Sequence, residues 1–141
     1  MPTAAAIRVL IADDQLLFAE ALAGALSADG RIDVVGIAAN GEEAVQLSSL
    51  LQPDVILMDL KMPLMDGVEA TRLIVGGAMP RPRVLILTGS DEPDALRRAR
   101  AAGASGYLTK DRSSAALSEA LTGLVSLAAA FPSGIQVEPE R

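Results

Sequence analysis

The sequence predicts an α/β fold, a three-layer doubly wound (βα)5 sandwich built on a five-stranded parallel sheet. Short apolar runs alternate along the chain with segments of helical spacing. Most of these runs are apolar at nearly every position, which is typical of parallel strands covered on both faces. The chain has 141 residues, the size of one ordinary domain. Because crossovers between parallel strands are right-handed, we expect helices on both faces of the sheet.

Five strands are expected, the last of them on a weaker signal. The second run is preceded by Asp33 and contains Gly36, which suits a strand at the edge of the sheet. The first, third and fourth runs are almost continuously apolar, as expected for strands covered on both faces. In chain order the five runs are 8–12, 34–37, 55–58, 84–87 and 104–108.

Five helices are expected, one after each strand. Asn40, with Glu43 three residues later, is a plausible capping arrangement for the second. An acidic stretch with a proline, 91–94, suits the first turn of the fourth. The other signals are the stripe Phe18, Leu22, Ala25 and Leu26, the stripe Ala44, Leu47 and Leu51, the span 68–75, and the stripe Leu117, Leu121, Leu124 and Ala128.

The expected domain spans residues 7–130. Residues 1–6 are expected to be a flexible N-terminus. Residues 131–141, with Pro, Ser, Gly and charges but no periodicity, are expected to be a tail or linker stub. The N-terminus lacks the basic and apolar regions of a signal peptide, and no apolar run is long enough to span a bilayer. We therefore expect a cytoplasmic protein with no membrane partner.

Composition excludes several functions. The chain has 12 Lys and Arg against 18 Asp and Glu, a net charge of −6, which argues against binding nucleic acid by bulk charge. One Tyr, two Phe and no Trp leave little for stacking on bases. With no His and no Cys there is no histidine base, no thiolate and no ligand of either kind. Any metal must be held by oxygen, which favours Mg²⁺, Ca²⁺ or Mn²⁺.

Reactive side chains follow the strands. Asp13 and Asp14 come after the first strand, Asp59 after the third, Thr88 after the fourth and Lys110 after the fifth. In an open α/β sheet the ligand site lies beyond the carboxyl ends of the strands, so these groups should meet there. Clustered carboxylates need a cation, and Mg²⁺ suits an all-oxygen set. The arrangement predicts a phosphoryl-transfer site with an aspartate nucleophile.

Four motifs resemble the receiver domain of two-component response regulators, in the CheY-like superfamily. Their spacing makes the match specific: Asp59 follows Asp14 by 45 residues, Thr88 follows Asp59 by 29 and Lys110 follows Thr88 by 22. The resemblance covers about residues 7–128. It implies the flavodoxin-like strand order 2-1-3-4-5. The form Gly-Tyr-Leu-Thr-Lys-Asp at 106–111 is most similar to the NarL/FixJ (LuxR-type) regulators.

The resemblance implies a role for each motif residue. Asp59 would be the phosphoacceptor, taking a phosphoryl group from a sensor histidine kinase or a phosphotransfer protein. Asp13, Asp14, Asp59 and the backbone carbonyl of Lys61 would hold Mg²⁺ (or Mn²⁺). Lys110 would bond a phosphoryl oxygen. The domain would be a signalling phosphoacceptor that catalyses only its own phosphorylation and dephosphorylation.

The resemblance also implies a switch. The hydroxyl of Thr88 would bond the phosphoryl group and Tyr107 would rotate inward, repacking the face made by the fourth helix, fifth strand and fifth helix. Lys61 and Ser90 would tune the lifetime of the phosphorylated state. Spare apolar surface on the last helix, such as Val125, could serve a homodimer.

Some features depart from the pattern. Gln15 stands where relatives of this type often carry His, and Asp111 where many receivers outside this subgroup have Pro. No helix-turn-helix domain fits after residue 128. We expect such a domain to control transcription from outside this chain, so that DNA is not bound by the receiver itself. The alternative is a single-domain receiver acting by protein contact.

Other interpretations remain open. A phosphatase of the haloacid dehalogenase type needs an aspartate two residues after its nucleophile, where this chain has Lys61. A flavodoxin-like cofactor binder needs a phosphate loop after the first strand, where the acidic pair would repel phosphate. A pseudo-receiver would be a binding module only. Singly, Asp14 could cap the first helix, and Arg97, Arg98 and Arg100 could form a solvated face.

Overall fold

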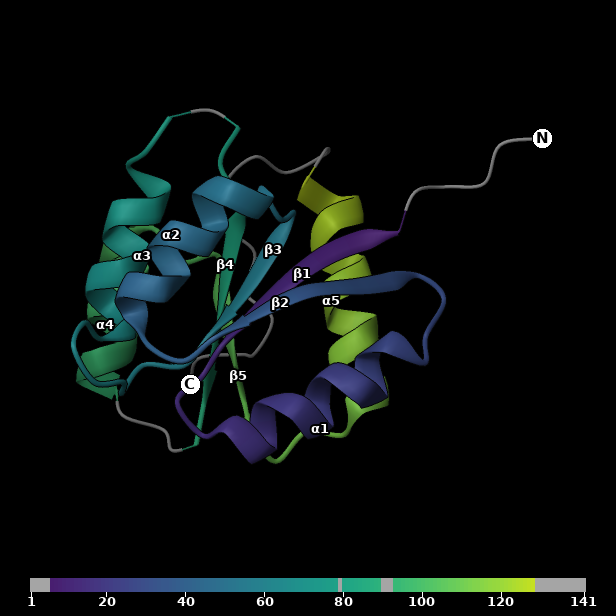
Figure 1. Ribbon diagram of the computed structural model, residues 1–141. Coiled ribbons are helices and arrows are strands. Elements are labelled where there is room, and N and C mark those ends of the chain that lie inside the picture. Colours follow the sequence, from purple (N-terminus) through teal and green to yellow (C-terminus); the bar gives the residue numbers. More distant parts are fainter. Residues whose placement is uncertain (1–5, 79, 90–92, 129–141) are drawn as a thin grey trace.

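The computed structural model describes residues 6–78, 80–89 and 93–128. Five strands and five helices alternate along this part of the chain (Figure 1). The expected flexible N-terminus, apart from Ala6, and the expected tail lie outside the described residues. In chain order the elements are β1 (Ile7–Ala12), α1 (Leu16–Ser27), β2 (Ile32–Ala38), α2 (Gly41–Leu51), β3 (Val55–Met58), α3 (Gly67–Val75), β4 (Arg83–Thr88), α4 (Pro93–Ala102), β5 (Gly106–Thr109) and α5 (Ser114–Ala128).

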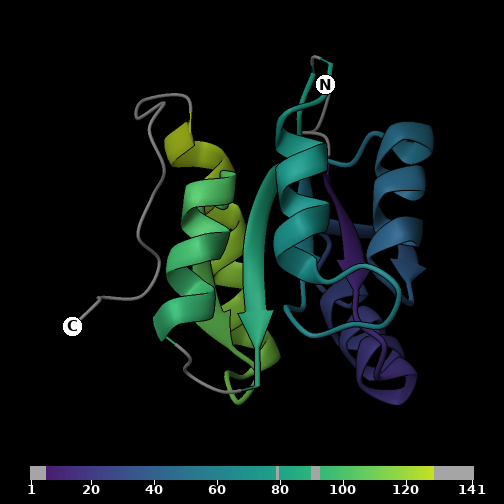
Figure 2. The same cartoon turned by 90° about the vertical axis from the view of Figure 1, so that its left-hand side faces the viewer.

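The five strands form one parallel sheet in the order β2-β1-β3-β4-β5, which confirms the predicted fold class. Helices α1 and α5 cover one face and α2, α3 and α4 the other; Figure 2 looks onto the second of these faces. Alternate residues of β1 serve the two layers, because Val9 and Ile11 pack toward α1 and α5, and Leu10 packs toward the other helices. Burial on both faces explains why the interior strands are continuously apolar.

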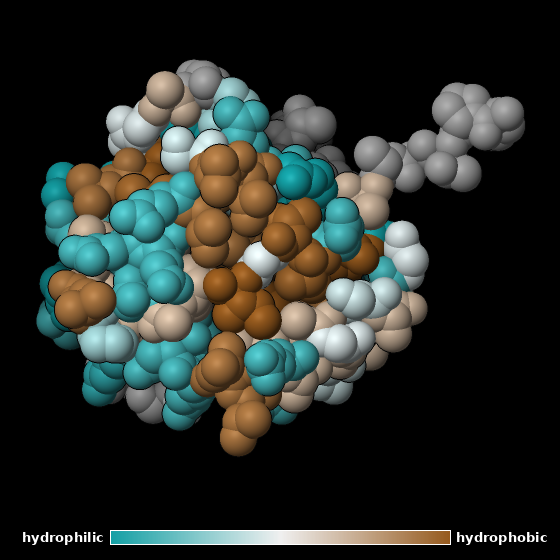
Figure 3. Space-filling model, viewed as in Figure 1, coloured by the Kyte–Doolittle hydropathy of each residue, from teal (hydrophilic) through white to brown (hydrophobic). Residues whose placement is uncertain are grey.

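Strand β2 lies at the edge, as predicted. Its Asp33 is exposed, and its pairing with β1 is irregular, since Val9 opposes Val34 whereas Leu10 opposes Gly36. This bulge interrupts the regular edge that another strand would need. Figure 3 shows apolar side chains gathered on the surface over β2 and the neighbouring helices.

One predicted feature of the first helices needs correction, and another is confirmed. In α1 the buried positions include Ala19, whereas Ala25 is exposed, so the predicted stripe is wrong at Ala25. In α2 the side chain of Asn40 accepts a hydrogen bond from the Glu43 backbone N–H at 2.9 Å, as predicted. The Glu43 carboxylate, however, accepts from the backbone of Ala39 at 2.8 Å rather than from Asn40. The predicted cap at Asn40 is therefore confirmed, and the reciprocal bond of Glu43 reaches the residue before the cap.

The second half of the chain follows the prediction closely. Helix α3 is capped by Asp66, which accepts from the Glu69 N–H at 2.9 Å. Helix α4 starts at Pro93, and residues 91–92 of its expected first turn lie outside the described residues. In α5, Leu117, Leu121 and Leu124 are buried as expected, while the side chain of Val125 is outside the description.

Strand β5 starts at Gly106, two residues later than predicted. The reason is the end of α4. Gly103 has a φ of +117°, and the Ala104 N–H donates to the Ala99 carbonyl at 3.0 Å. Residue 104 therefore still satisfies a helix carbonyl and cannot join the sheet. None of the helices in the described part of the chain is long and apolar enough to cross a membrane.

Candidate functional site

The carboxyl ends of four strands bring the predicted groups to one edge of the sheet. Three of these groups are held by a backbone hydrogen bond that extends a strand pairing by one residue. Asp13 N–H donates to the Ala38 carbonyl at 2.9 Å, Asp59 N–H to the Ala12 carbonyl at 2.9 Å, and Lys110 N–H to the Thr88 carbonyl at 2.8 Å. The position of the site is thus a consequence of strand register.

Three carboxylates meet at this edge. One oxygen each from Asp13, Asp14 and Asp59 lies within 4.8 Å of the other two. Asp13 and Asp59 are buried, with relative exposures of 1% and 8%, whereas Asp14 is exposed. Charges this close and this poorly solvated repel strongly. The cluster therefore needs positive charge.

Lys110 supplies one such charge. Its Nζ lies 2.8 Å from Asp13 Oδ2 and 3.4 Å from Asp59 Oδ2. The ammonium is itself sheltered, since the Lys110 side chain is only 14% exposed. One ammonium against three carboxylates leaves the cluster with excess negative charge.

The ionisation of Asp59 reflects this conflict. Burial, and then repulsion from Asp13, raise the pKa of Asp59 from 3.8 to about 6, although Lys110 and the Leu60 backbone N–H oppose the rise. The Leu60 N–H donates to Asp59 Oδ1 at 2.9 Å. An added cation would relieve the repulsion and lower the pKa of Asp59.

The residues present fit a hard divalent cation. The set of ligand atoms is all oxygen, as Mg²⁺ prefers. Asp13 Oδ2 is buried and, despite its ion pair with Lys110, accepts no well-aligned hydrogen bond. A buried carboxylate oxygen with spare lone pairs is unusual unless a cation or an ordered water uses them. Asp14, exposed beside it, offers a carboxylate that needs no displacement of a protein partner to bind a metal.

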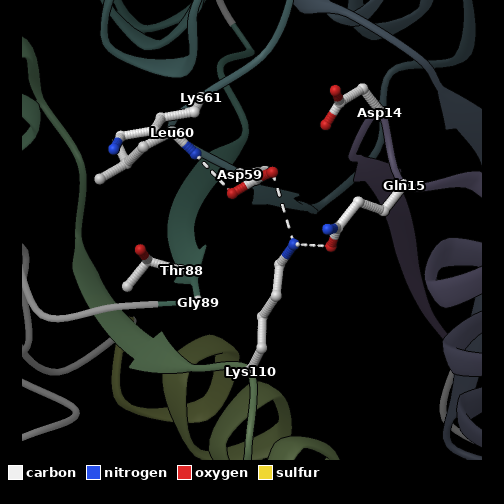
Figure 4. A pocket seen from close by; sticks show the side chains of 8 residues that line it. All are labelled: Asp14, Gln15, Asp59, Leu60, Lys61, Thr88, Gly89 and Lys110. Carbon is white, nitrogen blue, oxygen red and sulfur yellow. Dashed lines mark hydrogen bonds and ion pairs between the residues drawn. The ribbon is translucent and has the colours of Figure 1, made fainter.

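A cleft of about 300 Å³ opens over the cluster. Figure 4 shows Asp59 at the centre of the cleft, with Thr88 and Lys61 on one side of it and the Lys110 ammonium, Gln15 and Asp14 on the other. Thr88 itself is only 5% exposed. The full lining is Asp14, Gln15, Asp59, Leu60, Lys61, Thr88, Gly89 and Lys110. The cleft is thus lined by a buried carboxylate, a hydroxyl and two lysine side chains, a set suited to a phosphoryl group.

A tight loop supports Asp59 from behind. The Gly67 N–H donates to the Leu60 carbonyl at 2.8 Å, which folds the segment after β3 back on itself. A Cβ placed on Gly67 would lie 2.0 Å from the carbonyl oxygen of Asp59. Only glycine permits this approach.

Most predicted site residues come together here. Asp13 lies beneath the cleft, paired with Lys110, and Lys61 is among the lining residues. Tyr107 does not line the cleft. It is half-buried on β5 and packs against the core layer under α2, α3 and α4. Ser90 lies outside the described residues. The alternative that Asp14 caps the first helix is wrong, because the N-cap residue of α1 is Gln15 and no side chain caps it.

Sequence reasoning missed two contacts of Lys110. Gln15 Oε1 accepts a hydrogen bond from Lys110 Nζ at 2.9 Å. The ring centroid of Phe18 lies 4.8 Å from the same nitrogen, close enough for a cation–π contact. The position of Gln15, directly after the acidic pair at a strand end, was a usable signal. Phe18 read only as a core residue of the first helix, so it gave none.

Comparison with known proteins identifies relatives of most of this chain. The family described as the response regulator receiver domain matches residues 9–122. The transcriptional regulatory protein LnrK of Bacillus subtilis is 42% identical over 107 residues, 76% of this chain and 48% of that protein. The transcriptional regulatory protein NarL of Mycobacterium tuberculosis is 40% identical over 105 residues, 74% of this chain and 48% of that protein. The solved NarL signal receiver domain superposes with a TM-score of 0.82 at 35% identity, covering 87% of this chain and 98% of that one. The chain thus spans about half the length of these curated relatives.

Proposed function

Because this chain belongs to the response regulator receiver domain family, with relatives of the NarL/LuxR type, we propose that it carries a signal as a phosphoryl group on Asp59. The observation that supports this most is the grouping of Asp59, Lys110 and Thr88 around one cleft, above a buried carboxylate. Asp59 is the only carboxylate of the cluster that is both largely buried and among the residues lining the cleft in the described structure.

In the proposed reaction a carboxylate oxygen of Asp59 attacks the phosphorus of the donor. A new P–O bond forms to Asp59 as the P–N bond to a donor histidine breaks, and the imidazole leaves with the electron pair. With an acyl phosphate as donor, a P–O bond breaks instead. Lys110, already 3.4 Å from Asp59 Oδ2, would donate to an oxygen of the transferred group. Since the chain has no histidine, the phosphohistidine must belong to another molecule.

A divalent cation belongs to this proposal. Asp13, Asp14, Asp59 and the backbone carbonyl of Lys61 would hold Mg²⁺ or Mn²⁺, which when bound supplies charge neutralisation for the phosphoryl oxygens. Asp14 would be a direct ligand and Asp13 would act mainly through water. Lys110 pairs with Asp13 from the buried side, with Nζ 2.8 Å from Asp13 Oδ2.

Switching would follow from the new group. The Thr88 hydroxyl would move to bond a phosphoryl oxygen, and Tyr107 would turn into the space that it leaves. The two residues lie on neighbouring paired strands, where Ile86 opposes Tyr107 and Thr88 opposes Thr109, so a shift of one can reach the other. Lys61 and Ser90 would flank the attacking water and tune dephosphorylation.

The partners would be a sensor histidine kinase, or a phosphotransfer protein, and an output element. The curated relatives are transcriptional regulators about twice as long as the matched region. We therefore propose that this receiver controls transcription through a domain outside the chain, without touching DNA itself. A single-domain receiver acting by protein contact is the alternative. A homodimer is part of the same proposal.

The experiment is covalent modification by a small donor. Incubated with acetyl phosphate and Mg²⁺, the protein should gain one phosphoryl mass in an intact-mass measurement, and Asp59→Asn should not. Asp33→Asn, an exposed carboxylate on the far edge of the sheet, is the matched control and should be modified normally. A folded wild-type protein that gains no mass would rule out the proposal.

A further inference from the structure

Gln15 lies at the rim of the cleft, and none of the roles above uses its side chain. It is the N-cap residue of α1, yet it makes no side-chain capping bond. Short polar side chains normally fill this position and bond their own helix. The Gln15 side chain turns instead to Lys110, 95 residues away in sequence, and accepts a hydrogen bond from Nζ at 2.9 Å (Figure 4). The side chain of Gln15 therefore bonds Lys110 in the site instead of capping helix α1.

The contact matters because of what else Lys110 touches. An ammonium has three protons to donate and nothing to accept with. Three oxygens surround this one at 2.8 Å (Asp13 Oδ2), 2.9 Å (Gln15 Oε1) and 3.4 Å (Asp59 Oδ2). The Phe18 ring covers another side of the ammonium. Lys110 is therefore held closest to Asp13 and Gln15, and farthest from the carboxylate that would react.

The longest of these distances is the informative one. Ammonium–carboxylate hydrogen bonds are normally about 2.7–2.9 Å long. Without the Gln15 oxygen the third proton would have only the two carboxylates to serve, and the ammonium would close on Asp59. A carboxylate oxygen that accepts a short bond from an ammonium has less electron density to give to phosphorus.

Resting on the proposed phosphoryl transfer to Asp59, we propose that Gln15 is a positioning residue. Its amide oxygen holds the Lys110 ammonium back from Asp59 until a phosphoryl group arrives. Of the three oxygens around Nζ, the one on Gln15 is the neutral one. Exchanging its hydrogen bond to Lys110 for one to an anionic phosphoryl oxygen therefore costs less free energy than exchanging the contact of either carboxylate.

The test compares two replacements of Gln15 in acetyl phosphate reactions followed by intact mass. Gln15→Leu keeps a side chain of similar size but has no oxygen. It should slow phosphorylation about three- to tenfold, the range expected for a partly exposed hydrogen bond to a charged group. Gln15→His restores an acceptor nitrogen when neutral, so at pH 8 its rate should lie within about twofold of the wild type. Leu17→Ala, an 84% exposed residue on the same turn of α1, should react normally.

The outcomes separate this inference from the function on which it rests. If the wild-type protein gains no phosphoryl group, both the proposed function and this inference are refuted. If the wild type reacts and Gln15→Leu reacts equally fast, Gln15 does not position Lys110. If Gln15→Leu and Gln15→His are equally slow, the acceptor atom is not what matters. If Gln15→Leu also weakens Mg²⁺ binding, measured by titration without a donor, the substitution has distorted the loop that carries Asp14 and the inference is overturned.

Discussion

The charge conflict at Asp59 predicts that removing this carboxylate stabilises the metal-free protein. The pKa of Asp59 is raised from 3.8 to about 6, chiefly by burial and then by repulsion from Asp13. Ionised Asp59 therefore costs the folded state free energy. The side chain is only 11% exposed, so solvent screens little of this cost. In Asp59→Asn the carboxylate is gone, while Lys110 keeps its ion pair with Asp13 at 2.8 Å.

The size and pH dependence follow from linkage. A pKa difference of about 2, at ~1.36 kcal/mol per pKa unit, corresponds to about 3 kcal/mol. Because the pKa of Asp59 is higher in the folded state, its cost is absent below pH 3.8, grows between pH 3.8 and about 6, and is complete above that range. The loss of the Lys110 contact to Asp59 offsets part of the gain. We expect Asp59→Asn to be more stable by between about 1 and 3 kcal/mol at pH 8, and by less than about 0.5 kcal/mol at pH 4.

Urea unfolding in a metal chelator measures this directly. The free energy of unfolding is determined for wild type and Asp59→Asn at several pH values from 4 to 8, and the difference between the two proteins isolates Asp59. Asp33→Asn, which changes an exposed carboxylate of β2, should differ from wild type by less than about 0.5 kcal/mol at any pH. A difference for Asp59→Asn that is absent at pH 8, or equal at pH 4 and pH 8, would refute the reasoning.

Three further predictions concern the same region. Gly67→Ala should lower the free energy of unfolding in urea by more than about 2 kcal/mol, because its Cβ would lie 2.0 Å from the Asp59 carbonyl oxygen. Gly24→Ala, whose Cβ would have nothing within 4 Å, should instead stabilise α1 by about 0.5–1 kcal/mol. Equal effects of the two substitutions would contradict the geometry. Asp14→Ala should abolish the rise in melting temperature that Mg²⁺ gives the wild type, and an undiminished rise would show that Asp14 is not a ligand. Phosphorylation should change the fluorescence or NMR signal of Tyr107, and identical signals in both states would remove this residue from the switch.

The fold was predictable from sequence because its signal is carried by many residues at once. Continuous apolar runs, such as Val55–Met58, follow from burial on both faces, and their alternation with helical spacing leaves few topologies. Local errors arose where a backbone detail decided the outcome. Strand β5 starts late because Gly103, with a positive φ, follows the end of α4. The predicted stripe was wrong at Ala25 because a short apolar pattern does not fix the rotation of α1 to within one residue.

The candidate site was predictable to a different degree. The rule that parallel strands end at one edge was enough to bring Asp13, Asp59 and Lys110 together. The rule says nothing about which atoms touch, so it could not find the bond between Gln15 and Lys110. That bond depends on the Gln15 side chain pointing away from its own helix, and the spacing of apolar residues gives no information about such a conformation. The sequence feature that could have indicated this bond was the residue type, an amide directly after two carboxylates at a strand end.

The same charges that weaken the fold are those that suit it to signalling. Three carboxylates and one ammonium leave an excess of negative charge beside the cleft, and Asp59 bears the cost as a raised pKa. A divalent cation would relieve that cost, so its binding is driven partly by repulsion already present in the folded protein. A phosphoryl group on Asp59 would bring new negative charge into this cleft, where Lys110, Lys61 and the cation could offset it. New charge on Asp59 would favour a movement of neighbouring polar groups, and the buried hydroxyl of Thr88 lines the same cleft. We therefore expect stability to be lowest, and the capacity to respond greatest, at this edge of the sheet.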